Sequence, residues 1–231
     1  EAKDEAAVLR EVAEIQVGGG DGNIVGRNMF RRPWKDSVAL GQKILAVILA
    51  STQRSFANAD ELVAYALQDQ KAGDVLFDLK ARQQVPATVP PFGPGVLPDG
   101  TPDPTTYPDD VARMLAQEFA NESSELKANL ERIYRHGETG GTGKLFILPI
   151  DQAIEHSPGK SFAPNPPAAD IWYQLTLAHT LGMSAYVAHP GAIRQIAHRA
   201  RELGMPLIAK MNASYSKGGR EKVAQHSFLL D

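Results

Sequence analysis

The chain of 231 residues contains no cysteine. Disulfide bonds, cysteine-ligated metal centres and thiol nucleophiles are therefore excluded. The absence of cysteine also agrees with a reducing compartment, so we expect the protein to be cytoplasmic.

Neither sign of charge dominates, because 24 lysines and arginines stand against 27 aspartates and glutamates, a formal net charge of -3. Without a basic excess, we expect neither nucleic acid nor an anionic membrane surface as a partner. Long apolar runs are also missing, since a membrane span requires roughly 18 to 20 apolar residues. No basic-then-apolar signal opens the chain, and we expect both ends to be cut from a longer parent.

Histidines are few and poorly spaced for metal binding. The chain has six histidines but no HxxxH or HExxH pattern. Because zinc sites on helices use those spacings, we expect no metal centre.

Prolines are distributed unevenly. Half of the sixteen lie between Pro86 and Pro108, in VPATVPPFGPGVLPDGTPDPTTYP. Such a stretch forms neither a helix nor a central strand. It is a linker or a wrapping arm, and an ordered and a disordered path over residues 82–108 have the same sequence signature.

What the chain does contain is a set of helices and strands that alternate. Apolar spacing predicts helices at 4–15, from Pro33 to about 50, after an N-cap at Asn58, and at 109–120 and 124–136, with a short strand at 23–26. The second half reads as strand 145–151, helix 168–181, strand 184–188, helix 191–203 and strand 206–212. This alternation predicts parallel strands with helices outside, in an open doubly wound sheet or a (β/α)8 barrel.

The stretch GGGDGNIVGRNMFRRPW, residues 18–34, has the composition of an anion-binding turn. Backbone N–H groups at glycines can converge on a phosphate, and Arg27 can add a bidentate contact. The alternative is a tight glycine turn that carries a surface arginine. The trailing Gly-Arg-Asn and Arg-Pro-Trp favour phosphate.

Asp151 ends one apolar strand, and Lys210 lies inside another, the predicted strand 206–212. Asp151 can act as an acid, a base or the partner of a cation, or it can merely cap the next turn. Glu155 and His156 follow in a loop that can shape the mouth of a site. Lys210 is either a Schiff-base nucleophile or the ionic partner of Asp151, and we favour the ion pair.

Two blocks of the sequence resemble the prokaryotic and archaeal type of class I fructose-bisphosphate aldolase, a family of Schiff-base barrels. GGGDGNIVGRNMFRRPWKDSVALGQKILAVI, residues 18–48, resembles the carboxyl-terminal block of the family. ELKANLERIYRHGETGGTGKLFILPIDQAIEHSPGKSFAPNPPAAD, residues 125–170, resembles its amino-terminal block, and the likeness continues through MSAYVAHPGAI to PLIAKMNAS.

The resemblance implies roles for particular residues. Asp151 takes the acid role at the end of strand one, and His156 and Lys210 are supporting candidates. The substrate phosphate is bound by Gly19, Gly20, Gly26 and Arg27. The chain departs from the family at Ala153, where glycine is usual, and in lacking the middle of the barrel with its Schiff-base lysine on strand six. Lys210 aligns with a lysine of strand three and does not inherit that role.

The resemblance also implies an architecture. The expected fold is α/β, a partial (β/α)8 TIM barrel whose parallel strands follow the barrel order eight, one, two, three, so that the phosphate turn and Asp151 share one rim. We divide the chain into an aldolase-type βα unit at 1–50, a joining segment at 51–124 and an amino-terminal barrel half at 125–231. The chain is a permuted half-barrel or a window across two tandem copies.

The function implied is that of a glycolytic lyase. It cleaves fructose 1,6-bisphosphate, or another phosphorylated ketose, through a lysine Schiff base that another part of the barrel supplies, without a cofactor. Exposed sheet edges predict a homo-oligomer or a complementing barrel half as partner. The alternative is a non-catalytic phosphosugar-binding or subunit-interaction module, whereas the histidine spacing disfavours a zinc aldolase.

Overall fold

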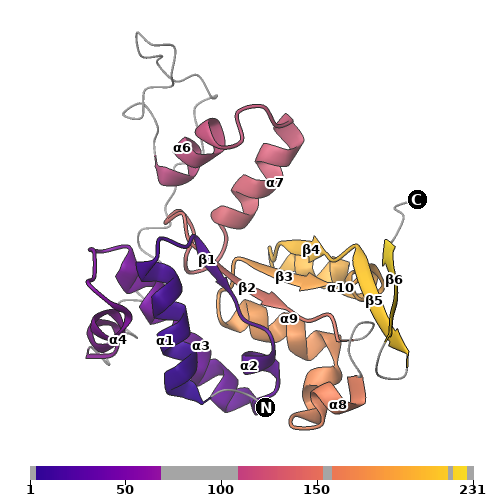
Figure 1. The fold of residues 1–231 in the computed structure, drawn as a ribbon. Helices are drawn as coiled ribbons and strands as arrows, with labels where there is room; N and C mark the ends of the chain where they lie inside the picture. Colours follow the sequence, from indigo (N-terminus) through magenta and orange to yellow (C-terminus); the bar gives the residue numbers. More distant parts are fainter. Residues whose placement is uncertain (1–3, 69–108, 153–157, 218–220, 228–231) are drawn as a thin grey trace.

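Four short parallel strands form the centre of the molecule. In a computed structural model, described for residues 4–68, 109–152, 158–217 and 221–227, they lie side by side in the order β1-β2-β3-β4 (Figure 1). Their bounds are β1 (Gly22–Ile24), β2 (Leu145–Pro149), β3 (Ala185–Ala188) and β4 (Leu207–Ala209). All three pairings are parallel. β1 and β2, which lie far apart in the sequence, are thus neighbours in the sheet, as predicted.

Helices surround this sheet and alternate with its strands along the chain. Those within the described ranges are α1 (Glu5–Val17), α2 (Arg27–Phe30), α3 (Trp34–Ser51), α4 (Ala59–Gln68), α6 (Asp110–Gln117), α7 (Ser124–Tyr134), α8 (Pro158–Phe162), a 3-10 turn (Pro166–Ala169), α9 (Ile171–Thr180) and α10 (Pro190–Glu202). The chain is therefore an α/β protein with a parallel sheet, an arrangement compatible with part of a barrel.

Side-chain caps begin several of these helices. Asp4, Asp109, Ser123 and Asp170 each accept a hydrogen bond from a backbone N–H in the first turn of the helix that follows. The predicted cap at Asn58 is confirmed, since its Oδ1 accepts from the N–H of Glu61 at 2.9 Å. Each cap satisfies a donor that the helix itself leaves unpaired, at about 1 kcal/mol per cap.

The main core lies between the sheet and the helices. Phe146 and Leu148 of β2 and Tyr186 of β3 belong to one buried cluster with apolar side chains of α1, α3, α9 and α10. Side chains alternate between the two faces of a strand, so Ile147 points to the other face. In β1 the same alternation buries Asn23, whereas Ile24 is 70% exposed. One face of β1 is thus packed against helices and the other is open.

Two glycines hold the loop before β2 against the turn before β3. The N–H of Glu138 donates to the carbonyl of Gly182 at 2.7 Å. Gly137 has a φ of 78°, and a Cβ on it would lie 2.1 Å from the Gly182 oxygen. The backbones approach this closely because neither residue carries a side chain.

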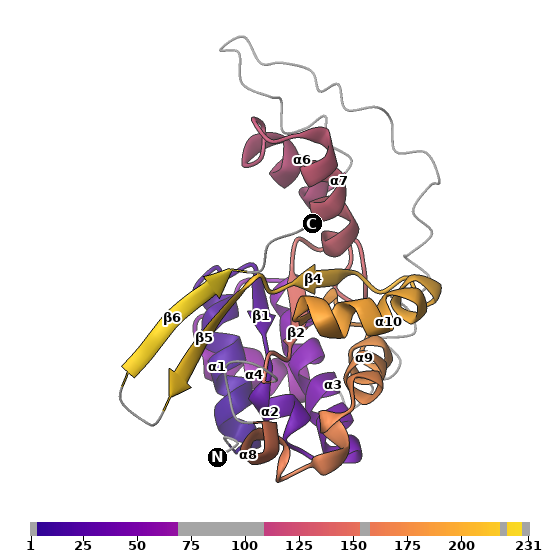
Figure 2. The same cartoon turned by 90° about the vertical axis from the view of Figure 1, so that its right-hand side faces the viewer.

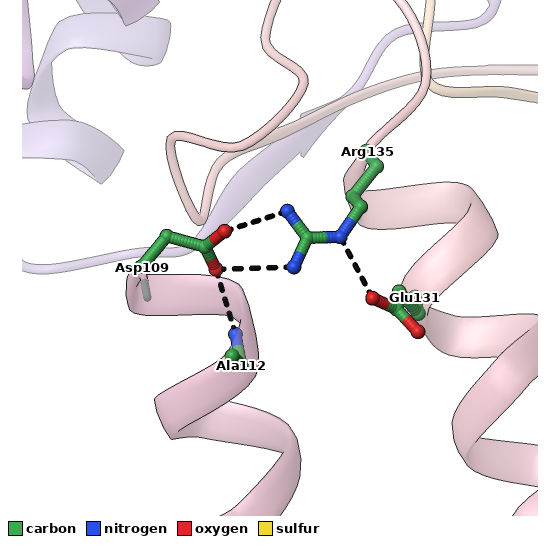
Figure 3. Close-up of polar contacts among 4 residues, drawn as sticks. All are labelled: Asp109, Ala112, Glu131 and Arg135. Carbon is green, nitrogen blue, oxygen red and sulfur yellow. Dashed lines mark hydrogen bonds and ion pairs between the residues drawn. The ribbon is translucent and has the colours of Figure 1, made fainter. Parts of the chain in front are cut away.

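Helices α6 and α7 form a pair beyond the start of β2 and project from the rest of the molecule (Figure 2). Their link is an ion-pair network around Arg135 (Figure 3). Arg135 bonds both carboxylate oxygens of Asp109, at 2.7 and 3.3 Å, and the carboxylate of Glu131 at 2.8 Å. Burial raises the pKa of Asp109, but the hydrogen bonds from Arg135 and Ala112 outweigh it and lower the pKa below its ordinary value.

The structure corrects the predicted elements at four places. The strand predicted at 206–212 ends at Ala209, and Asn212 begins β5 (Asn212–Lys217), which pairs antiparallel with β6 (Glu221–Ser227). The helix predicted at 168–181 begins at Ile171, after the 3-10 turn. Helices α2 and α8 were not predicted, because four or five residues are too few to show a helical period.

Candidate active site

The carboxyl ends of the four strands meet at one edge of the sheet. Gly26 and Arg27 follow β1, Asp151 follows β2, His189 follows β3 and Lys210 follows β4. Backbone hydrogen bonds keep these ends level, since Ile150 donates to the Val187 carbonyl at 3.0 Å and Lys210 to the Ala188 carbonyl at 2.9 Å. In parallel α/β folds this edge carries the catalytic groups.

Asp151 and Lys210 form an ion pair at this edge. The Nζ of Lys210 contacts the Oδ2 of Asp151, and both side chains are 21% exposed. Because β3 lies between β2 and β4, the pair spans three strand ends. The predicted pairing of Lys210 with Asp151 is therefore confirmed.

Gly26 and Arg27 form the corner next to Asp151. A Cβ on Gly26 would lie 2.8 Å from the carbonyl oxygen of Pro149, so the corner rests directly on the end of β2. Val25 donates to the Ile147 carbonyl at 3.0 Å and extends the β1–β2 pairing to the same point. The side chain of Arg27 is exposed. Its charge is thus accessible beside the end of β2.

Asn165 fixes the backbone that follows this corner. Its Nδ2 donates to the carbonyls of Phe30 and Arg32, at 2.9 and 2.6 Å. The same nitrogen lies 3.1 Å from the hydroxyl of Tyr173. Asn165 is buried, and it ties the segment before α9 to the turn between α2 and α3. These contacts hold the helix that begins at Arg27 in a defined place.

Two residues that sequence reasoning missed lie against the backbone of Asp151. The Nε2 of His189 is 2.9 Å from the Asp151 carbonyl oxygen. The Oε1 of Gln152 accepts from the Asp151 N–H at 3.1 Å. Both side chains are buried, at 4% exposure. The sequence feature that could have identified His189 is its position, because it directly follows a strand, as Asp151 does.

Two of the predicted phosphate-binding residues lie away from this edge. Gly19 and Gly20 precede β1, whereas Gly26 and Arg27 follow it. A strand advances by about 3.3 Å per residue, so the two glycine pairs lie at opposite ends of β1. Gly19 has a φ of 84° and serves the turn that ends α1. Glu155 and His156 lie outside the described residues.

A hollow of about 370 Å³ lies away from these strand ends. Gln16, Val17, Ser51 and Thr52 line it, on the side from which the chain enters β1. The hydroxyls of Ser51 and Thr52 donate to backbone carbonyls of their own helix. Because these two hydroxyls bond within α3 and the hollow lies away from the strand ends, we place the candidate site at the strand ends.

No described helix combines the length and the apolar character that a membrane crossing requires. Across the described residues, no three histidine, aspartate or glutamate side chains gather in a way that would hold a metal ion.

The chain is similar to proteins named probable class 1 fructose-bisphosphate aldolase. It is 36% identical over 104 residues to the protein of Chlamydia muridarum, and 36% identical over 104 residues to that of Chlamydia trachomatis. In each case the aligned residues make up 45% of this chain and 29% of the relative. The Chlamydia pneumoniae protein is 34% identical over 98 residues, 41% of this chain and 27% of the relative.

The similarity is therefore partial in both directions. The match spans less than a third of the length of these relatives. No protein-family model and no solved structure matches the chain. The relatives support an aldolase affiliation for the matched part.

Proposed function

We propose that the chain is part of a class 1 fructose-bisphosphate aldolase. In this proposal the complete protein cleaves fructose 1,6-bisphosphate into dihydroxyacetone phosphate and glyceraldehyde 3-phosphate. The observation that carries the proposal is the parallel pairing of β1 with β2, which brings the Gly26–Arg27 corner and Asp151 to one edge. A phosphate-binding group and a carboxylate at one edge are what a sugar phosphate substrate requires.

The corner after β1 is the phosphate site of this proposal. Arg27 is exposed there, Arg31 and Arg32 follow between α2 and α3, and Lys35 lies in the first turn of α3. A guanidinium presents paired donors that match the oxygens of a phosphate. Gly26 has no room for a side chain beside Pro149, so the corner keeps its backbone close to β2. Arg27 is the residue that we assign to the phosphate.

Asp151 is the acid–base group of this proposal. Its carboxylate accepts the proton of the substrate hydroxyl as the bond between the two halves of the sugar breaks. Lys210 stabilises the ionised carboxylate through their ion pair. The same pair favours the ammonium form of Lys210, whereas a Schiff-base nucleophile must be a neutral amine. Lys210 therefore supports Asp151, and we assign the imine-forming lysine to another part of the barrel.

The proposal is tested by complementation. The chain is mixed with a fragment of the Chlamydia muridarum relative that lacks the 104 aligned residues. With fructose 1,6-bisphosphate and borohydride, we expect a reduced adduct on a lysine of the fragment, and cleavage that neither part shows alone. Asp151→Asn should lower the cleavage rate by about a hundredfold, within the range for general acid–base catalysis. A folded complex without imine or cleavage would remove the proposal.

A second candidate is a module that binds a phosphosugar without cleaving it. It is favoured by the short overlap with the relatives and by the engagement of Lys210 with Asp151. Titration of the chain alone with dihydroxyacetone phosphate distinguishes the two. Tight binding together with no turnover in the complementation experiment supports the binding module, and turnover supports the aldolase.

A further inference from the structure

The peptide unit of Asp151 is held by buried side chains at both of its polar groups. Gln152 accepts the hydrogen of the Asp151 N–H, and the Nε2 of His189 lies 2.9 Å from the Asp151 carbonyl oxygen. The carboxylate of the same residue contacts Lys210. Every polar group of Asp151 thus has a contact within the described site.

His189 is well placed to act on this peptide. It directly follows β3, the strand between those that carry Asp151 and Lys210. It is also the N-cap residue of α10, where its backbone carbonyl accepts from Ile193 at 3.0 Å, and Pro190 fixes the first turn. The imidazole is 4% exposed. A ring anchored in this way has little freedom to leave the Asp151 carbonyl.

We propose that His189 is a positioning residue for Asp151. Its Nε2–H donates a hydrogen bond to the Asp151 carbonyl and fixes the backbone from which the carboxylate reaches Lys210. A carbonyl oxygen only accepts hydrogen bonds, so Nε2 must carry the proton. The hydrogen bond from His189 to the Asp151 carbonyl does not depend on which reaction the protein catalyses, whereas its effect on catalysis rests on the proposed aldolase function.

The tautomer of His189 is the first test. Long-range nitrogen–proton NMR spectra of the labelled chain, with His189→Gln used to assign the signals, report which ring nitrogen is protonated. We expect the proton on Nε2, with exchange slower than at His198, whose side chain on α10 is 85% exposed. A neutral ring with the proton on Nδ1 alone would overturn the proposal, because Nε2 would then have no hydrogen to donate.

The reactivity of Lys210 is the second test. Reductive methylation rates are measured by mass spectrometry, with the exposed Lys35 as internal reference. In His189→Ala we expect Lys210 to react about fivefold faster, the factor that corresponds to the net contribution of one hydrogen bond. His189→Gln retains an amide donor near the position of Nε2 and should restore slow methylation, whereas His198→Ala should change nothing. An unchanged Lys210 rate in a folded His189→Ala chain would overturn the proposal.

The complemented enzyme gives the third test. A positioning role predicts that His189→Ala lowers kcat by about tenfold with little change in KM, and that His189→Gln recovers most of the loss. A rise in KM with kcat unchanged would contradict a role of His189 in positioning the acid–base group. If complementation yields no enzyme, the proposed function fails, and the tautomer and methylation results still decide whether His189 donates this hydrogen bond to Asp151.

Discussion

Lys210 and Asp151 are 59 positions apart in the sequence and form an ion pair across the end of β3. Both side chains are partly buried, at 21% exposure. The pair therefore links the carboxyl ends of β2 and β4 through side chains, while backbone pairing with β3 links them through the sheet.

Removal of either partner should destabilise the chain. Lys210→Met leaves the Asp151 carboxylate without its cation, and Asp151→Asn leaves the ammonium without its anion. The exposure of this ion pair lies between that of a surface salt bridge and that of a fully buried one. We therefore expect each change to lower the free energy of unfolding by about 1–3 kcal/mol. The double variant should lose less than the sum of the two. Denaturant titration measures all three, and strictly additive losses would show that the pair is not coupled.

The contact between Gly137 and Gly182 predicts a sharp difference between two glycine substitutions. In Gly137→Ala the new Cβ would meet the Gly182 oxygen at 2.1 Å, at a φ of 78°. Gly141 has a similar φ of 82° but nothing within 4 Å of its added Cβ. We expect Gly141→Ala to cost about 1–2 kcal/mol for the left-handed backbone alone, and Gly137→Ala to cost at least about 2 kcal/mol more. Equal melting temperatures for the two variants would contradict the close approach.

Much of this architecture is predictable from the sequence, because apolar period and strand-ending residues are local signals. The run LFILP, for example, becomes β2 with Phe146 and Leu148 in the core. The residue at which β4 ends was harder to predict from the sequence. The run from Leu207 to Met211 contains no turn residue, so the change of strand at Lys210 depends on pairing with β6 rather than on local sequence.

Asn165 should be required for the corner that carries Arg27. Asn165→Asp replaces the donating nitrogen by an acceptor and sets oxygens against the Phe30 and Arg32 carbonyls. We expect a loss of about 1–3 kcal/mol in stability, since both carbonyls lose a buried partner. Gln195→Ala, on the exposed surface of α10, is the control and should change stability by less than about 0.5 kcal/mol. Hydrogen exchange should show faster opening of α2 in the first variant, and unchanged exchange there would refute the role of Asn165.

The ion pair between Asp109 and Arg135 predicts a loss of stability in acid. The folded pKa of Asp109 lies below its ordinary value of 3.8, so its contribution is complete above that value and disappears as the pH falls through the folded pKa. Asp109→Asn removes this contribution, and we expect a cost of about 1 kcal/mol at pH 7 that shrinks as the pH falls through the folded pKa of Asp109. Unfolding titrations at several pH values measure the difference. If the loss of unfolding free energy in Asp109→Asn stays constant with pH, the variant does not act through the ionised Asp109 carboxylate.

The site was less predictable than the fold, for reasons of geometry. Glycine content alone does not say at which end of a strand a turn lies, so Gly19 and Gly20 were grouped with Gly26 although β1 separates them. The pairing of Lys210 with Asp151 follows from charge and position. His189 was missed because no local sequence pattern marks a single histidine as a site residue. Its contact with the Asp151 carbonyl exists only once β2 and β3 are paired.

The central claim is that the corner after β1 binds the phosphate of a sugar substrate, and calorimetric titration of the chain with fructose 1,6-bisphosphate tests it most directly. Arg27→Gln is compared with Arg201→Gln, a matched change at an exposed arginine of α10. We predict that Arg27→Gln weakens binding by at least about tenfold, as expected for loss of a charge-assisted contact, and that Arg201→Gln does not. Equal affinities of the Arg27→Gln and unaltered chains, or equal binding of unphosphorylated fructose, would contradict the claim.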